Sequence, residues 1–386
     1  MATSPLASLI PLALLFLPSL ASGCYTRLFA FGDSLTDTGN FHHSIGDQFD
    51  PVARLPYGQT YFGRPTGRFS DGRVIVDFVA KAFGLPFTLP YLVGRTADDF
   101  KYGANFAVGG ATALNNDYFR KRDVEPNWTE HSLDEQIRWF KQLLNMLATQ
   151  SERDELMRNS LFFVGEIGGN DYNHLFIRSK TLDEVRAIVP DVADAIGAAV
   201  KELIQLGAKT LVIPGNFPIG CVPLYLRVYQ SDKEEDYHPK TRCINWLNEF
   251  AEYHNRMIIN KINSLKESYP NVTIIYADYY GASMNIFRDP VQFGFEVPLN
   301  ACCGSDAPYN CTPSILCGSP GSSVCKDPST YASWDGLHLT EASYKLVAEG
   351  ILEGPYASPP LTKSCTNLQC DSDTLKLPFS DPFSSI

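Results

Sequence analysis

The tripeptide Gly32-Asp33-Ser34 follows a short apolar run, Leu28 to Phe31, of the kind that forms a buried β-strand. A serine placed there lies at the carboxyl end of a strand, where open parallel sheets build their binding crevices. Its hydroxyl can attack a carbonyl carbon if a base accepts the proton and hydrogen-bond donors stabilise the oxyanion. The same tripeptide is also a common turn whose side chains cap helices, so its meaning depends on partners elsewhere in the chain.

Two histidines follow an aspartate by three residues and are candidates for the base: Asp171 precedes His174, and Asp335 precedes His338. This spacing can bring the carboxylate to the imidazole, where it fixes the ring tautomer and stabilises the imidazolium. The second pair lies in a loop before the last expected helix, a position from which a side chain can overhang the strand ends. We therefore expect a catalytic role for the second pair and a packing or surface role for His174.

Two glycine-containing segments at the same sheet edge could supply oxyanion donors. Gly168-Gly-Asn170-Asp171 follows an apolar run and offers the amide side chain of Asn170. Asn105-Phe-Ala-Val-Gly109-Gly110 offers backbone N–H groups close to the expected position of the reacting carbonyl. The structural alternatives are a tight turn for the glycine pair and a strand-end Asx cap for Asn170.

Short apolar runs alternate with segments of helical periodicity along most of the chain, which predicts an α/β fold with a parallel sheet covered on both faces. Three helix boundaries carry their own signals: Asp71 as an N-cap with Gly84 as an end, a Ser132/Glu135 capping box, and Gly350 as the exit of the last helix. The expected strands lie within 28–31, 100–108, 161–164, 210–213 and 272–276, and the expected helices within 72–83, 132–147, 182–206 (interrupted at Pro190), 246–265 and 340–350.

Length and charge narrow the class of protein. The 386 residues suffice for one large α/β domain, and the formal net charge is −11 with no dense run of Lys or Arg. Phosphate contacts require a basic face, so this balance argues against nucleic acid as a partner.

The N-terminal segment has the features of a secretory signal. An apolar core, Leu6 to Leu17, precedes the small residues Ala21, Ser22 and Gly23, so we expect residues 1–23 to be cleaved and one mature domain over 24–386. A membrane anchor is the alternative, but the segment is short for a bilayer span and contains two prolines. We therefore expect a soluble, secreted protein with no stable membrane anchor.

Cysteines and glycosylation sequons agree with secretion. Ten cysteines are present, and five of them crowd a Gly/Pro/Ser-rich loop near 302–325 whose spacing does not resemble a zinc site. Disulfides in an oxidising compartment explain them better. We expect disulfides of Cys365 and Cys370 to fasten a C-terminal tail that begins near residue 355. The pairing stays open at this point. Three sequons begin at Asn127, Asn271 and Asn310.

Taken in order, these blocks resemble the GDSL esterase/lipase family of the SGNH hydrolase superfamily, and most closely its secreted plant branch. The resemblance covers nearly the whole mature chain. One departure is Val108, where plant members often have serine. The matching segments are Phe31-Gly-Asp-Ser-Leu35, Asn105-Phe-Ala-Val-Gly-Gly110, Gly168-Gly-Asn-Asp171 and Asp335-Gly-Leu-His338, extended by 213–221, Cys302-Cys-Gly304 and 333–340.

The resemblance implies a three-layer α/β/α, flavodoxin-like fold with a five-stranded parallel sheet. It implies Ser34 as nucleophile, His338 as base and Asp335 as its orienter. The oxyanion hole would use the backbone amides of Ser34 and Gly110 with the Asn170 side chain, and Gly109 is the alternative to Gly110. Cys221 would pair with Cys243, whereas Cys311 stands where relatives commonly lack a cysteine.

The expected activity is hydrolysis of a carboxylic ester through an acyl-serine, without a metal or organic cofactor. The family resemblance points to short-chain acetyl or hydroxycinnamoyl esters of polar alcohols, such as choline or cell-wall polysaccharide. Two alternatives remain: an acyltransferase that uses the same acyl-serine, and a catalytically silent wall or defence protein on this fold. Neither oligomeric state nor physiological substrate follows from the sequence.

Overall fold

A central parallel sheet organises the protein in the computed structural model, which describes residues 24–46, 50–125 and 128–365. Its strand order is β2-β1-β3-β4-β5, and every neighbouring pair is parallel. Along the sequence, β2 is added on one side of β1, and β3, β4 and β5 are then added on the other side. This change of side at β1 is the arrangement that opens a crevice at the strand ends. The five strands are β1 (Arg27–Phe31), β2 (Gly103–Asn105), β3 (Ser160–Val164), β4 (Thr210–Pro214) and β5 (Thr273–Ala277).

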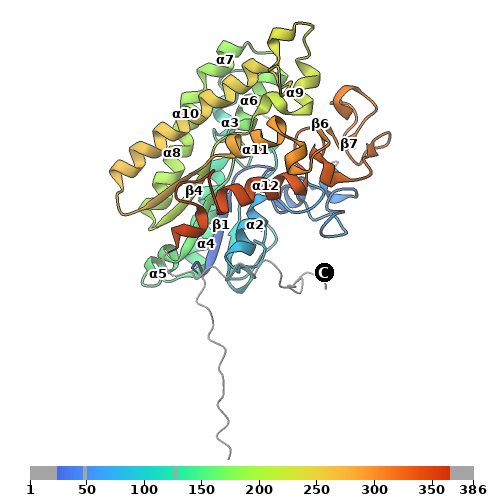
Figure 1. Ribbon diagram of the computed structural model, residues 1–386. Coiled ribbons are helices and arrows are strands. Elements are labelled where there is room, and N and C mark those ends of the chain that lie inside the picture. The colour runs from blue at the N-terminus through green and yellow to red at the C-terminus, as the bar shows by residue number, and fades with distance from the viewer. Residues whose placement is uncertain (1–23, 47–49, 126–127, 366–386) are drawn as a thin grey trace, which may run out of the picture.

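Helices cover both faces of this sheet, as predicted (Figure 1). The longer ones are α2 (Ile75–Ala82), α4 (Leu133–Leu147), α8 (Val189–Gln205), α10 (Asn245–Ser268), α11 (Tyr279–Arg288) and α12 (Glu341–Leu352). The shorter ones are α1 (Asn40–Ser44), α3 (Asn116–Arg120), α5 (Arg153–Arg158), α6 (Gly169–Ile177), α7 (Leu182–Ala187) and α9 (Pro223–Val228). None of the helices in the described part of the chain is both long and apolar enough to cross a membrane.

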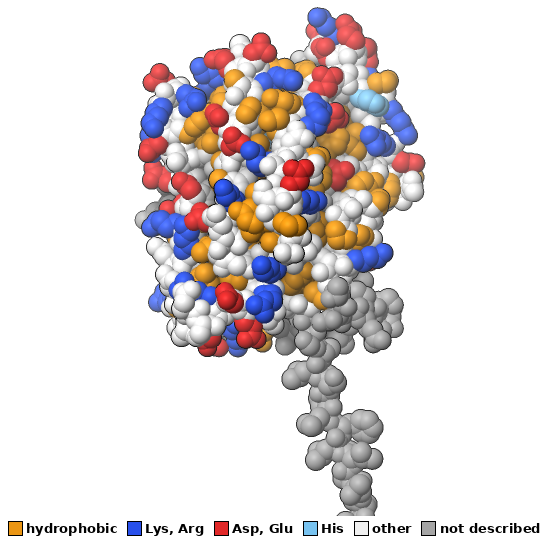
Figure 2. Space-filling view, turned by 90° about the vertical axis from the view of Figure 1, so that its left-hand side faces the viewer, with side chains coloured by type: hydrophobic (Ala, Val, Ile, Leu, Met, Phe, Trp, Pro, Cys, Tyr) orange, Lys and Arg blue, Asp and Glu red, His pale blue; other side chains and the backbone are white. Residues whose placement is uncertain are grey.

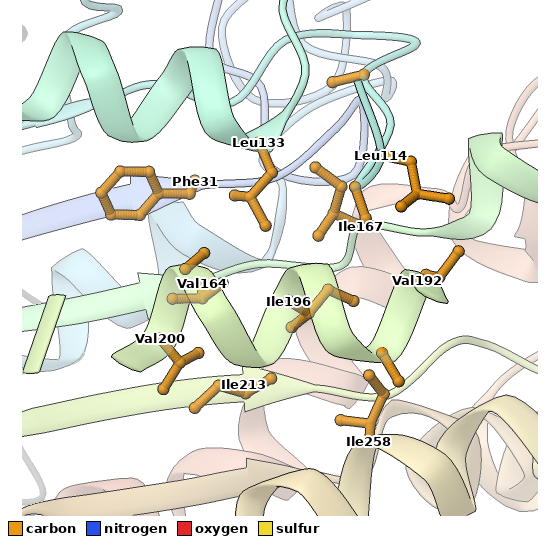
Figure 3. Packing of buried hydrophobic residues seen from close by; sticks show 14 of the residues in the cluster. Phe31, Leu114, Leu133, Val164, Ile167, Val192, Ile196, Val200, Ile213 and Ile258 are labelled. Carbon is orange, nitrogen blue, oxygen red and sulfur yellow. The ribbon is translucent and has the colours of Figure 1, made fainter. Parts of the chain in front are cut away.

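Successive strand residues point to opposite faces of the sheet, which creates two apolar cores. On β1, Phe29 and Phe31 face a core shared with α4, α8 and α10, whereas Leu28 and Ala30 face a core shared with α2, α11 and α12. Figure 3 shows part of the first core, in which Val200 of α8 lies next to Ile213 of β4. Because both faces are covered, the strands read as continuous apolar runs rather than alternating ones.

Side chains of both charges occur on the surface of the protein. On the face shown in Figure 2, Lys and Arg side chains are interspersed with Asp and Glu rather than gathered into a basic stripe. The excess of acidic residues therefore does not form a single-sign field on that face.

Two predicted helix boundaries are wrong, and a third is right in position but lacks its predicted capping box. Asp71 does not cap α2; its carboxylate instead accepts from the Glu341 backbone amide at 2.7 Å, while Asp77 accepts from the Val74 amide at 2.9 Å. Ser132 makes no side-chain cap bond, because its hydroxyl donates to Asp134 and no capping box forms. The last helix continues past Gly350 to Leu352.

Four disulfides join cysteines within residues 24–46, 50–125 and 128–365. The pair implied by the family resemblance, Cys221–Cys243, is present. The Cys-rich segment carries Cys302–Cys325 and Cys303–Cys317, and Cys302–Cys325 joins the start of β7 (Cys303–Gly304) to the end of β8 (Ser323–Val324), its antiparallel partner. Nearby, β6 (Val297–Ala301) pairs with β9 (Tyr331–Ser333). Cys365 pairs with Cys24 rather than within the tail, and Cys370 lies outside the described residues. Cys311 is a buried free thiol.

A buried ion pair fixes the loop before α2, and its loss should destabilise the protein. The Arg68 guanidinium makes two bonds to Asp77, Nε to Oδ2 at 2.8 Å and Nη2 to Oδ1 at 2.7 Å, with both side chains at most 7% exposed. Removing one partner leaves an uncompensated buried charge, so Asp77→Ala should lower the unfolding free energy by about 3–5 kcal/mol in urea titrations. The exposed Asp98, whose oxygen is 3.7 Å from Lys101, is the matched control: Asp98→Ala should change stability by less than about 1 kcal/mol.

Candidate active site

Three side chains from distant parts of the chain form one hydrogen-bonded line at the carboxyl edge of the sheet. The His338 Nε2 atom is 2.8 Å from the Ser34 Oγ atom, and the His338 Nδ1 atom is 2.7 Å from Asp335 Oδ2. Ser34 is 8% exposed and His338 is 7% exposed, so the line is shielded but reachable from one side. The expected approach of His338 to Ser34 is therefore present in the structure.

A tight turn before α12 positions the aspartate and the histidine together. The Asp335 Oδ1 atom accepts from the backbone amides of Leu337 at 3.0 Å and His338 at 2.8 Å, while Oδ2 also accepts from the Tyr57 hydroxyl at 2.8 Å. Burial alone would raise the pKa of Asp335, but the neighbouring His338 and these donors lower it to about 2. The carboxylate thus remains ionised at neutral pH and can hold one imidazole orientation.

Gly32 sets the turn that presents Ser34, and a distant glutamine holds this glycine. Its amide donates to Gln136 Oε1 at 2.9 Å, and Gln136 Nε2 donates back to the Gly32 carbonyl at 2.8 Å. Gly32 has φ +136°, and a Cβ atom there would lie 2.9 Å from the Glu166 carbonyl oxygen. The position therefore requires glycine both for its backbone conformation and for the close approach of the segment that contains Glu166.

Asp37 joins the loop after β1 to the loop after β2. Its carboxylate accepts four backbone amides, those of Gly39, Asn40, Phe41 and Gly109, at 2.7–2.9 Å. Burial raises the pKa of Asp37 to about 6, against the opposing effect of these donors. Sequence reasoning gave Asp37 no role, because the contact with Gly109 spans 72 residues.

The two neighbouring glycines differ in whether their backbone amides are already hydrogen-bonded. The Gly109 N–H is already bound to Asp37, whereas the amides of Ser34 and Gly110 have no hydrogen-bond partner within residues 24–46, 50–125 and 128–365. Asn170 also lies at this edge, but its Nδ2 donates to Asp33 Oδ2 and to the Ala111 carbonyl, each at 3.0 Å. Two backbone donors are thus unoccupied, while the Asn170 amide would have to share a proton.

Gly110 has little room for a side chain, which makes it a test of the oxyanion position. Its φ is +81°, and an added Cβ atom would lie 2.4 Å from the Trp128 Cβ atom. Gly110→Ala should therefore displace the amide and lower kcat by about 10²–10³-fold in a p-nitrophenyl acetate assay. Gly294→Ala is the matched control, because Gly294 has a similar φ of +84° but open space around it, and activity there should be unchanged.

The other Asp–His pair does not form a catalytic arrangement. His174 is 1% exposed and stacks on Trp128 with ring centroids 4.4 Å apart, and burial lowers its pKa to about 4. Asp171 accepts instead from the amides of Ala113 at 2.8 Å and Leu114 at 2.9 Å. The expected packing role of His174 is confirmed.

A pocket opens over Ser34 and His338, with a cavity volume of about 70 Å³. Its wall combines aromatic and apolar side chains, among them Tyr172, Phe217 and Tyr225, with the buried carboxyls of Asp33 and Glu166. Burial raises the pKa of Asp33 to about 6 and raises that of Glu166, whose carboxyl is also next to Asp33. Such a pocket suits a small organic ester with an apolar part.

No group of three or more His, Cys, Asp or Glu side chains in the described part of the chain is placed to hold a metal ion. Of the sequon asparagines, Asn271 is exposed. Asn310 is half-buried and its Nδ2 donates to the Ala301 carbonyl at 3.1 Å, while Asn127 lies outside the described residues.

The parallel α/β sheet, with a serine, a histidine and an aspartate aligned at its carboxyl edge, defines the class of α/β serine hydrolases. The family model described as GDSL-like Lipase/Acylhydrolase matches residues 28–351. The chain belongs to this family, and with it to the carboxylic ester hydrolases.

Relatives support the same assignment. A GDSL esterase/lipase of Arabidopsis thaliana is 46% identical over 91% of this chain and 90% of its own length. A sinapine esterase of Brassica napus is 44% identical over 88% of each chain. Among solved structures, a salicylyl-acyltransferase from a tetracycline biosynthetic pathway matches 89% of this chain and 55% of its own, with 9% identity and a TM-score of 0.33, which is too low to support an inference.

Proposed function

We propose that this protein hydrolyses small carboxylic esters through an acyl-enzyme formed on Ser34. The observation that carries the proposal is the continuous line from the Ser34 hydroxyl through His338 to Asp335, at 2.8 and 2.7 Å, inside a pocket. This is the geometry that a serine nucleophile and its general base require.

In the first half-reaction, Ser34 Oγ attacks the ester carbonyl carbon while its proton moves to His338 Nε2. The carbonyl oxygen becomes an oxyanion, which the free amides of Ser34 and Gly110 stabilise. Collapse of this intermediate breaks the bond to the alcohol oxygen, and His338 returns the proton to the departing alcohol. Asp335 remains ionised throughout and stabilises the imidazolium.

In the second half-reaction, water takes the place of the alcohol. His338 accepts its proton as the water oxygen attacks the acyl carbon, and collapse releases the carboxylic acid and restores the Ser34 hydroxyl. Interception of the same acyl-serine by an alcohol would instead give acyl transfer. Product analysis by chromatography with an acceptor alcohol present distinguishes the two outcomes.

For the substrate, we propose short-chain acetyl or hydroxycinnamoyl esters of polar alcohols such as choline or cell-wall polysaccharide. The aromatic rings of Phe217 and Tyr225 in the pocket offer faces for an aromatic acyl group. A relative at 44% identity is a sinapine esterase, which favours testing a choline ester of a hydroxycinnamic acid first.

We also propose that the protein acts outside the cell after removal of residues 1–23. Four disulfides among the described residues support an oxidising compartment. The exposed sequon at Asn271 could carry a glycan there.

The direct test is to trap the acyl-enzyme. A fluorophosphonate probe should label the intact protein, and peptide mass spectrometry should locate the adduct on the peptide that contains Ser34. A protein that stays unlabelled, or that is labelled at another serine, would refute the proposal, and the first result would favour the silent wall protein. Rapid quenching during turnover of p-nitrophenyl acetate should add one acetyl group to the same peptide.

A further inference from the structure

The side-chain amide of Asn170 is held at both of its ends. Its Nδ2 atom lies 3.0 Å from Asp33 Oδ2 and 3.0 Å from the Ala111 carbonyl oxygen. Both partners are acceptors, so this end is the NH₂ group and the opposite end is the amide oxygen. That oxygen accepts from the Nδ2 atom of Asn173 at 3.2 Å. The orientation of the Asn170 amide is therefore fixed from two sides.

Asn173 is in turn oriented by a tyrosine from a different helix. Asn170 and Asn173 lie three residues apart on α6, so their side chains are neighbours on the helix surface. The Asn173 Oδ1 atom accepts from the hydroxyl of Tyr225 on α9. Burial raises the pKa of Tyr225, so this hydroxyl stays protonated and can act as the donor. With its oxygen occupied by Tyr225, Asn173 presents its NH₂ group to Asn170.

This line of hydrogen bonds belongs to the wall of the active-site pocket. Asn170, Asn173 and Tyr225 all line the pocket that contains Ser34. Asn170 and Tyr225 are buried, and Asn173 is half-buried. The line therefore connects α9 to Asp33, the residue before Ser34, through side chains that packing holds in place.

The bond from Asn173 matters most when an oxyanion forms. Both protons of the Asn170 NH₂ group are already used, by Asp33 and by the Ala111 carbonyl. To donate to an oxyanion, this group must weaken one of those bonds. The bond at the amide oxygen does not compete with the oxyanion, so it can hold the amide while the NH₂ group changes partner. A donor at the oxygen also polarises the amide and strengthens its N–H groups as donors.

We propose that Asn173 and Tyr225 are positioning residues that aim the Asn170 amide at the oxyanion. Asn170 is then a third donor, beside the two free backbone amides at the site. Asn173 acts through the amide oxygen of Asn170, and Tyr225 acts through Asn173. Neither residue has to touch the ester in this role. The proposal rests on the proposed function of Ser34.

The first test measures kcat and KM for p-nitrophenyl acetate in two variants. Asn173→Ala removes the bond to the Asn170 oxygen and should lower kcat about tenfold while KM changes less than about twofold. Tyr225→Phe keeps the aromatic ring in the pocket wall but removes the hydroxyl, and its indirect effect should lower kcat about threefold. Unchanged kcat in both variants would overturn the proposal.

Tyr229→Phe is the matched control for Tyr225→Phe. The Tyr229 ring stacks on the Tyr225 ring with centroids 6.2 Å apart, but Tyr229 does not line the pocket. Its hydroxyl has no hydrogen-bond partner within residues 24–46, 50–125 and 128–365. Removal of this hydroxyl should leave kcat unaltered.

The second test repeats Asn173→Ala in the Asn170→Ala background. Asn170→Ala alone should lower kcat by about 10²–10³-fold. If Asn173 acts through Asn170, the double variant should be no slower than Asn170→Ala alone. An equal further loss in both backgrounds would overturn the proposal, because Asn173 would then act on the ester directly or only support the fold.

Asn173→Asp keeps the test valid if Asn173→Ala folds poorly. The substitution preserves the shape of the side chain and an oxygen for Tyr225, but its carboxylate has no N–H to donate to Asn170. It should lower kcat at least as much as Asn173→Ala, and full activity would refute the proposal.

Failure of the proposed function gives a different result, because Ser34→Ala would then keep its activity. If Asn170→Ala alone leaves kcat unchanged, Asn170 is not a donor, and the roles of Asn173 and Tyr225 are refuted while the role of Ser34 stands. Circular dichroism spectra that match the wild type are required of each variant, so that rates are compared between folded proteins.

Discussion

Ser34→Ala should lower kcat for p-nitrophenyl acetate by about 10⁶-fold while KM changes little. The substitution removes the hydroxyl on which we propose that the acyl-enzyme forms, whereas the pocket wall and the free amides of Ser34 and Gly110 remain. Residual turnover would then come from oxyanion stabilisation of direct attack by water. Initial rates over a range of substrate concentrations separate kcat from KM.

The control for this variant is Ser151→Ala, which changes an exposed serine far along the chain and should leave kcat unaltered. Fluorophosphonate labelling should disappear in Ser34→Ala and persist in the control. A Ser34→Ala protein that folds normally and retains more than a few per cent of activity would show that another residue is the nucleophile.

Asp335→Asn should lower kcat by about 10⁴-fold, the second-largest effect expected. Asp335 Oδ1 accepts two backbone amides, and these bonds orient the asparagine so that its NH₂ group replaces Oδ2 opposite His338 Nδ1. A donor in that place favours the tautomer whose proton is on Nε2, and this tautomer cannot accept the Ser34 proton. Steady-state kinetics on the folded variant measures the loss.

Tyr57→Phe provides the graded comparison. The Tyr57 hydroxyl donates to the same Oδ2 atom at 2.8 Å, so its removal weakens one support of the carboxylate without changing the tautomer. We expect a loss of kcat of about tenfold, consistent with one hydrogen bond to a charged group. Equal losses in the two variants would contradict the tautomer explanation, because only Asp335→Asn places a donor opposite the imidazole.

The fold was largely predictable because each central strand is a compact apolar run with a helical segment after it. The short strand expected within 100–108 is confirmed as Gly103–Asn105, but the sequence did not show which of these residues pair with β1. Gly103 approaches β1 so closely that an added Cβ would lie 2.0 Å from the Leu28 carbonyl oxygen. The hydrophobic periodicity of the sequence does not reveal such a close approach of two backbone segments.

The predicted side-chain caps do not form, for a related reason. Asp71 and Ser132 have the right residue types for N-caps, but nearby and distant partners compete for their oxygens: Asp134 takes the Ser132 hydroxyl, and the amide of Glu341, 270 residues away, binds Asp71. Capping preferences describe local contacts, and tertiary contacts override them.

At the site, local spacing placed Asp335 beside His338, and family resemblance placed both near Ser34. The supporting contacts could not be found in this way. Gln136 reaches Gly32 across 104 residues, and Tyr57 reaches Asp335 across 278. Asp37 had to be seen bound to Gly109 before the unoccupied amide could be assigned to Gly110.

The disulfide between Cys24 and Cys365 has a practical consequence. It lies three residues before β1 begins, at the amino edge of the sheet, whereas Ser34 follows the carboxyl end of the same strand. A linker attached to the protein next to Cys24 or next to Cys365 would therefore leave the mouth of the pocket facing the solution. The enzyme should keep its access to bulky esters when immobilised in this orientation on a solid support.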